Sequence, residues 1–142
     1  MVAVPHDLTP SERTRFYHDM LKGFRYCRLA VGLHFRGTDK SGRHFVERYP
    51  GQLSDLLQMA RQSGIEGFDL EYWSPAPYWK STGSLNGLDG TLKSADPAFL
   101  NDFGDACVAD INYLQSHDLK VVQWGLQNEP VVGHVAYSDC YN

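Results

Sequence analysis

The sequence has few cysteines, and their positions form no recognisable framework. There are three in 142 residues, Cys27, Cys107 and Cys140, and none of them forms the C-x-x-C spacing of a zinc or redox motif. The six histidines likewise show no metal-ligand spacing. We therefore expect no metal, no cofactor and no disulfide-rich scaffold. The spacing allows either one disulfide with a free thiol or three free thiols.

Other missing signals each exclude a class of function. Acidic residues outnumber basic residues by 17 to 13, which argues against a nucleic-acid-binding protein with a basic surface. No apolar run approaches the length of a membrane span. Residues 1–13 do not have the pattern of a secretory signal, so the compartment stays unassigned. The lack of a phosphate-binding glycine loop, a nucleophile elbow and a Ser/His/Asp set disfavours nucleotide chemistry and ester hydrolysis.

The composition fits one folded domain that is rich in aromatic side chains. Apolar residues make up 42% of the chain, enough for a core, and 142 residues are typical of a single domain, so we treat residues 1–142 as one unit. Aromatic residues reach 13%, and flat aromatic faces suit protein cores and bound sugar rings equally well.

Helix and strand patterns alternate along the chain. Thr9 and Glu12 form a T-x-x-E capping box before the first helix, and Asp96 followed by Pro97 begins the third. The expected elements are a helix over 10–22, a strand over 26–33, a helix over 52–63, a strand over 65–72, a helix over 97–117 and a strand over 120–126. This alternation predicts right-handed βαβ units in a parallel sheet.

Three strands with three helices are about half of a (β/α)8 TIM barrel, which typically needs about 250 residues. We therefore expect an α/β fold, a partial TIM barrel of about three βα units without its C-terminal half. A smaller open α/β domain is the alternative. Open edges and uncovered apolar faces would make the isolated chain poorly stable.

Several apolar sets are expected to face the core. Phe16 and Met20 mark the inner side of the first helix. Gly104 weakens the third helix slightly and could permit close packing. The inner side of that helix comprises Phe99, Phe103, Cys107 and Leu114. The last strand is expected to be buried because of Val121, Val122, Trp124 and Leu126.

Functional residues are expected where the strands end, because a barrel places its active site there. Asn128 and Glu129 directly follow the last strand, and Glu129 is the candidate general acid/base. An ordinary strand exit with a solvated glutamate is the commoner meaning of a bare N-E-P tripeptide. Arg28, inside the first strand, needs a carboxylate partner. It could keep a catalytic glutamate ionised or form a buried structural ion pair.

A long loop over residues 73–96 follows the second strand, and long loops in compact domains are often functional. It opens with W-S-P-A-P-Y-W-K, in which two prolines stiffen the chain around three aromatic residues. Trp73, Tyr78 and Trp79 therefore predict a pre-organised binding wall. The alternative is that these aromatic residues pack onto their own strand ends.

Together these segments resemble glycoside hydrolase family 30, a retaining branch of the β-glycosidase barrels that carry an Asn-Glu pair after the fourth strand. The resemblance covers roughly residues 9–142. It rests on Y-C-R-L-A-V-G at 26–32, W-S-P-A-P-Y-W-K at 73–80 with Gly83 after it, Q-N-E-P at 127–130 and Y-S-D-C at 137–140.

The resemblance implies a hydrolase of O-glycosidic bonds with a carbohydrate substrate, of which this chain is the N-terminal half of the catalytic domain. It implies that Glu129 protonates the glycosidic oxygen and later deprotonates water. Asn128 would bind the 2-hydroxyl of the sugar, Trp73 would face that sugar, and Arg28 would lie near the nucleophile. The nucleophile itself would follow strand seven, outside this chain, so the fragment alone is expected to be inactive.

Two positions depart from the family pattern. His34 is nearest to a position where the family often has an acidic residue that binds sugar hydroxyls, and Tyr78 replaces a second tryptophan. Both are candidate substrate-binding residues, and both leave the sugar unidentified. A non-catalytic carbohydrate-binding remnant and a plain α/β structural domain are the alternative functions.

Overall fold

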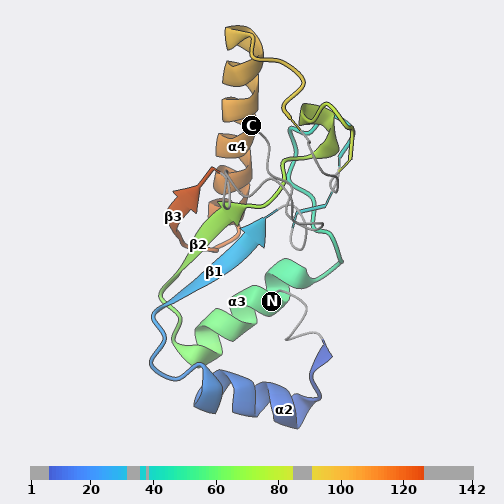
Figure 1. Cartoon of the computed structure of the whole chain (residues 1–142). Helices are drawn as coiled ribbons and strands as arrows, with labels where there is room; N and C mark the ends of the chain where they lie inside the picture. Colours follow the sequence, from blue (N-terminus) through green and yellow to red (C-terminus); the bar gives the residue numbers. More distant parts are fainter. Residues whose placement is uncertain (1–6, 32–35, 38, 85–90, 127–142) are drawn as a thin grey trace.

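The computed structural model describes residues 7–31, 36–37, 39–84 and 91–126, which form a three-stranded sheet with helices packed against it (Figure 1). The expected alternation of helices and strands is confirmed. In chain order the elements are α2 (Pro10–Arg15), the π-helical turn η1 (Phe16–Met20), β1 (Tyr26–Val31), α3 (Gln52–Ser63), β2 (Gly67–Tyr72), the 3-10 helix η2 (Pro77–Trp79), α4 (Pro97–Ser116) and β3 (Val121–Gly125).

Each strand of the sheet pairs with the next strand along the chain, in the order β1-β2-β3, and both pairings are parallel. The register between β2 and β3 shifts between Phe68 and Asp69. Because all three strands run the same way, Val31, Tyr72 and Gly125 end at one edge of the sheet, called the C-terminal edge below. The crossovers through α3 and α4 make this a partial (β/α) barrel, as the sequence predicted.

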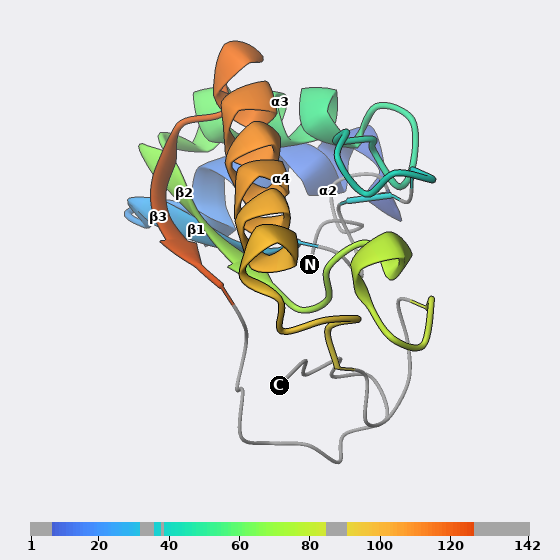
Figure 2. The ribbon, with the colours of Figure 1, turned by 90° about the horizontal axis from the view of Figure 1, so that it is seen from above.

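One face of the sheet is apolar and covered by helices. In both views α4 lies next to β2 and β3, and α2 lies beside α3 (Figures 1 and 2). Alternate strand residues meet the helices because side chains on a strand point to opposite faces. The buried core comprises Leu29, Phe68, Leu70 and Tyr72 from the strands, Leu53, Leu56 and Met59 from α3, and Phe103, Ala106, Cys107 and Leu114 from α4.

The opposite face of the sheet is mostly polar, and none of its side chains belongs to this core. It carries Arg28 on β1, Asp69 and Glu71 on β2, and Gln123 on β3. The expectation of an uncovered apolar face is therefore wrong for this side of the sheet. The reason is the strict alternation along β2, whose even-numbered residues are apolar and whose odd-numbered residues are Gly67, Asp69 and Glu71.

The last strand was expected to be buried, and this expectation is wrong. The side chains of Val122, Trp124 and Leu126 are 43%, 37% and 51% exposed. Among the described residues β3 has a neighbouring strand on one side only, so it is an edge strand. The apolar composition of β3 is typical of a strand that has neighbouring strands on both sides, which is why burial was expected.

The first helix begins as predicted and then changes its geometry. The Glu12 carboxylate accepts from the Thr9 amide at 2.9 Å, and Thr9 Oγ1 accepts from the Glu12 amide at 3.4 Å, which completes the capping box. The following residues form the π-helical turn Phe16–Met20. Its wider turn alters the angular spacing of the side chains. Tyr17 is therefore buried, and the expectation that Met20 faces the core is wrong, since it is 62% exposed.

The longest helix, α4, begins and ends where the sequence predicted. Asp96 Oδ1 accepts from the Ala98 amide at 2.8 Å and from the Phe99 amide at 3.4 Å. The expectation that Gly104 permits close packing is wrong, because a Cβ at this position would meet no atom within 4 Å. The buried side of the helix is the expected one, with Phe103, Cys107 and Leu114 in the core and Phe99 partly buried.

Candidate active site

An ion pair lies on the polar face of the sheet near its C-terminal edge. Arg28 on β1 forms an ion pair with Glu71 on β2, and the two side chains are 50% and 19% exposed. A Cβ built at Gly125 on β3 would lie 3.4 Å from Cγ of Glu71. The predicted need of Arg28 for a carboxylate is thus confirmed, and the pair lies on an accessible face. Asn128 and Glu129 follow Gly125 closely in the sequence.

The segment after β2 contains the predicted aromatic wall, and Trp79 is not part of its surface. Trp79 is 1% exposed and packs edge-on against Phe99, with ring centroids 5.4 Å apart. Its indole Nε1 donates to the Gly42 carbonyl at 2.9 Å. The alternative interpretation, aromatic packing onto the fold itself, is correct for Trp79. The stacking-wall interpretation is wrong for this residue because the helix α4 covers it.

Tyr78 and Trp73 differ from Trp79 in their exposure. Tyr78 is 36% exposed, and its ring is bordered by Lys93, with Nζ 4.5 Å from the ring centroid, and by Arg43, with Cζ at 5.3 Å. Trp73 is half-buried and directly follows β2. Lys80 is fully buried and donates from Nζ to Ser74 Oγ at 3.2 Å, which links the beginning and the end of residues 73–80.

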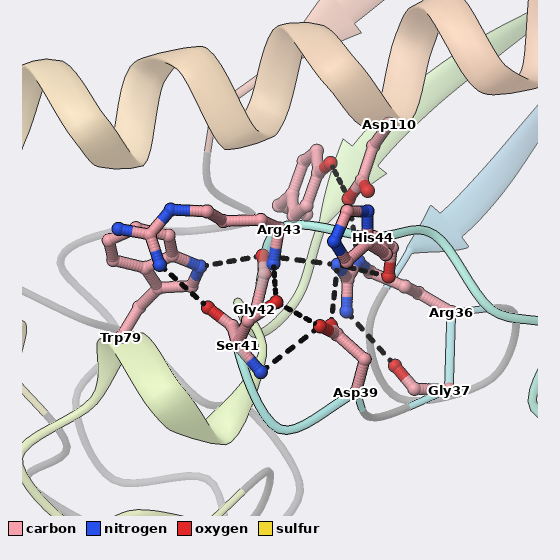
Figure 3. A network of polar contacts seen from close by, with 10 residues as sticks. Arg36, Gly37, Asp39, Ser41, Gly42, Arg43, His44, Trp79 and Asp110 are labelled. Atoms are coloured by element: carbon pink, nitrogen blue, oxygen red, sulfur yellow. Dashed lines mark hydrogen bonds and ion pairs between the residues drawn. The ribbon is translucent and has the colours of Figure 1, made fainter.

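A buried ion pair lies beside the C-terminal edge (Figure 3). Arg36 Nε donates to Asp110 Oδ2 at 2.6 Å, and the Tyr72 hydroxyl donates to the same oxygen at 2.7 Å. The Arg36 and Asp110 side chains are only 2% and 4% exposed. Burial raises the pKa of the Tyr72 phenol well above its ordinary value, and the Asp110 charge adds to this. The phenol therefore keeps its proton and remains a donor.

Arg36 also binds the backbone of the segment that follows it. Its Nη1 donates to the Gly37 carbonyl at 3.1 Å, and its Nη2 donates to the carbonyls of Gly42 and His44 at 3.2 and 3.0 Å. Figure 3 shows Gly42 between Trp79 and Arg36. These carbonyls lie in a loop without regular structure, so the guanidinium supplies hydrogen bonds that a sheet would otherwise give.

Three of the predicted site residues lie in the described part of the chain. The structure brings Arg28 together with Glu71, and it places Trp73 and Tyr78 in the segment after β2. His34, Asn128 and Glu129 lie outside the described residues, so their predicted roles stay predictions, and Cys140 also lies outside them.

Sequence reasoning missed the Arg36–Asp110 pair, although one signal was available. Asp110 shares the inner side of α4 with Cys107 and Leu114, at the spacing of three and four residues that defines a helix face. A carboxylate at a core position requires a buried donor or cation. Nothing in the local sequence identifies Arg36 as that cation.

The described residues form neither a metal-binding cluster nor a membrane-spanning helix. Within residues 7–31, 36–37, 39–84 and 91–126, no three His, Cys, Asp or Glu side chains gather in a way that could hold a metal ion. None of the helices in the described part of the chain is long and apolar enough to cross a membrane.

Comparison with known proteins gives similarity in structure only. No protein-family model matches the sequence, and no curated protein matches it. Among solved structures, SrfJ from Salmonella typhimurium gives a TM-score of 0.69 at 15% identity over 99% of this chain and 34% of that chain. The endo-β-1,6-glucanase BT3312 gives a TM-score of 0.72 at 18% identity over 92% of this chain and 32% of that chain.

A third similar structure is the glycoside hydrolase family 30 subfamily 8 xylanase Xyn30A from Clostridium acetobutylicum. It gives a TM-score of 0.66 at 16% identity over 90% of this chain and 30% of that chain. The chain therefore spans about a third of the length of these structures. In fold, it is similar to one part of a family 30 glycoside hydrolase barrel, as the resemblance in the sequence predicted.

Proposed function

We propose that this chain is part of a retaining β-glycosidase and that Glu129 is its general acid/base. The observation that carries the proposal is the ion pair of Arg28 with Glu71, whose register partner on β3 is Gly125, at the C-terminal edge of the sheet. Barrel enzymes hold their active sites at this edge, and the Asn-Glu pair follows Gly125 in the sequence. The similarity in fold to glycoside hydrolases supports the same function.

The proposed mechanism uses two carboxyl groups about 5–5.5 Å apart on opposite sides of the scissile bond. Glu129 donates its proton to the glycosidic oxygen while the nucleophile, in a part of the barrel outside this chain, attacks the anomeric carbon. Glu129, now a carboxylate, then takes a proton from the water that cleaves the glycosyl-enzyme. Asn128 hydrogen-bonds the 2-hydroxyl of the same sugar, and Trp73 faces its ring.

Arg28 has a supporting role in this proposal. It lies near the nucleophile and keeps that carboxylate ionised, because a neighbouring positive charge favours the charged form. A guanidinium has five N–H donors, so the ion pair with Glu71 is compatible with a second carboxylate contact. Tyr78 and His34 are two further proposed substrate-binding residues.

The burial of Trp79 argues against the competing idea of a non-catalytic carbohydrate-binding remnant. That function requires an exposed wall of stacked aromatic rings, and one of its three rings is in the core. Binding of an oligosaccharide without turnover would still favour the remnant, and neither binding nor turnover would favour a structural domain.

The test is the substitution Glu129→Gln in the whole protein, whose coding sequence on both sides of this chain is determined first. We expect hydrolysis of aryl β-glycosides with poor leaving groups to fall by about 10²–10⁴-fold, because protonation of the leaving oxygen is lost. Substrates with activated leaving groups should lose much less. Rates are measured on glucosides, xylosides, galactosides and fucosides.

The matched control is Glu66→Gln, the same chemical change at the opposite edge of the sheet. Glu66 precedes β2, is exposed and pairs with Arg25 at 2.7 Å. We expect this variant to keep wild-type rates on every substrate. The acid/base assignment is wrong if Glu129→Gln hydrolyses glycosides with poor leaving groups as fast as the control does.

A further inference from the structure

Arg36 joins the segment after β1 to the helix α4 and to the end of β2. Its Nε contacts Asp110 on α4, and its other nitrogens bind the carbonyls of Gly37, Gly42 and His44 and the Asp39 carboxylate. Asp110 accepts from Tyr72 through the same oxygen. Tyr72 is the last residue of β2 and directly precedes the segment with the predicted sugar-binding residues, so one guanidinium fixes three parts of the fold.

Gly42 extends this connection to the segment after β2. Its carbonyl accepts from both Arg36 and the Trp79 indole. A Cβ at Gly42 would lie 2.5 Å from Trp79 Nε1, and its φ of +67° is also unfavourable for other residues. The guanidinium and the indole therefore hold the Gly42 carbonyl between them. If the segment after β1 moved relative to the segment after β2, a hydrogen bond to a buried side chain would break.

We propose that Arg36 is a positioning residue, which holds the segments after β1 and β2 in a single arrangement at the sugar-binding edge. The effect of this positioning on catalysis rests on the proposed function. A buried ion pair adds little stability compared with apolar residues of similar volume. Apolar residues cannot donate hydrogen bonds, whereas the Arg36 guanidinium donates to three loop carbonyls and to the carboxylates of Asp110 and Asp39.

The proposal is tested with the double variant Arg36→Met/Asp110→Leu of the whole protein, which replaces both charges of the buried pair with apolar side chains. The matched control is Arg25→Met/Glu66→Leu, which removes the exposed ion pair that precedes β1 and β2. Amide hydrogen exchange is followed by mass spectrometry. We expect about ten-fold faster exchange in both 39–45 and 73–84 of the test variant, unchanged exchange in α3, and no change in these segments in the control.

Two exchange results would overturn the proposal. Faster exchange confined to residues 39–45 would show that Arg36 holds only its own loop. Equally faster exchange in α3 would show a general loss of the fold. Faster exchange in both segments with unchanged exchange in α3 is the result that only a positioning role gives. The two segments are separated in the sequence by the whole of α3 and β2.

Kinetics give the second readout and separate this proposal from the proposed function. With a glycoside substrate, the double variant should raise KM about ten-fold and change kcat by less than about three-fold. The KM of Arg36→Lys should lie between those of the wild type and the double variant, since lysine keeps the positive charge but lacks the several N–H donors of a guanidinium. A wild-type protein without glycosidase activity overturns the proposed function, and the exchange result then decides the role of Arg36. An active protein whose KM is unchanged in the double variant overturns the positioning role.

Discussion

At the scale of single residues, the core environment of Cys107 controls its reactivity. Burial raises the pKa of this thiol to about 12, and the nearby Asp110 carboxylate adds to the increase. The thiolate is the reactive form, so at pH 8 only about one thiol in ten thousand is available. Cys27, which is half-buried, also has a raised pKa, chiefly through burial.

We predict that iodoacetamide labels Cys107 in the native protein at pH 8 no faster than the protein unfolds. Burial and the raised pKa act in the same direction, because the folded protein offers iodoacetamide neither access to this thiol nor an appreciable thiolate fraction. Cys27 serves as the internal control, and labelled peptides are quantified by mass spectrometry. Native labelling of Cys107 at the rate seen in urea would contradict its buried position.

At the scale of secondary-structure elements, two glycines with open surroundings have opposite roles. A Cβ would meet no atom within 4 Å at either Gly104 or Gly64. Gly104 lies in the interior of α4, where glycine only adds flexibility to the unfolded chain. Gly64 caps α3 with a φ of +80°, in the left-handed region.

We predict that Gly104→Ala increases the free energy of unfolding by about 0.5–1 kcal/mol, because alanine favours the helix. Gly64→Ala should lower the free energy of unfolding by about 1 kcal/mol, because its Cβ is strained at positive φ. Urea titration followed by circular dichroism measures both changes. If both variants shifted the midpoint in the same direction, backbone conformation could not be the deciding factor.

The elements were predictable from the sequence because their signals are local. The bounds of α3 match the prediction, since its apolar spacing and terminal glycine lie within a dozen residues. The π-helical turn was missed because no capping or periodicity rule distinguishes it from an α-helix. The exposure of β3 was missed because its apolar composition predicts a strand that is covered on both sides. The composition does not reveal that β3 has one neighbouring strand in the described part of the chain.

The candidate site was only partly predictable, for a reason of distance along the chain. Arg28 was identified from its place in a strand, and its partner Glu71 lies on the neighbouring strand. Arg36 and Asp110 are 74 positions apart, so only the folded chain brings them together. Trp79 was assigned to the surface because an aromatic residue in a loop gives no local sign of the helix that covers it.

At the scale of the whole molecule, the two faces of the described sheet differ. The helix side forms the core, the other side is mostly polar, and β3 exposes apolar side chains along one edge. An edge strand with exposed backbone groups and apolar side chains can pair with another chain. The expected poor stability of the isolated chain should therefore appear together with self-association.

We predict that Val122→Lys weakens self-association of the isolated 142-residue chain by at least about ten-fold, because a charged edge opposes strand pairing. Val108→Lys is the matched control. Val108 is 54% exposed on α4, so the surface loses the same apolar group while the strand edge is unchanged. Sedimentation at several concentrations measures the association. An equal effect of the two substitutions would point to general hydrophobic contact in place of edge pairing.

The order of the strands has a consequence for the synthesis of the protein. In the described part of the chain β1, β2 and β3 lie in the sheet in their order along the sequence, so β2 leaves the ribosome after its partner β1, and β3 leaves it after its partner β2. None of these three strands has to be inserted between two others. The sheet can thus grow one strand at a time as the chain is synthesised, with α3 made before β2 and α4 made before β3.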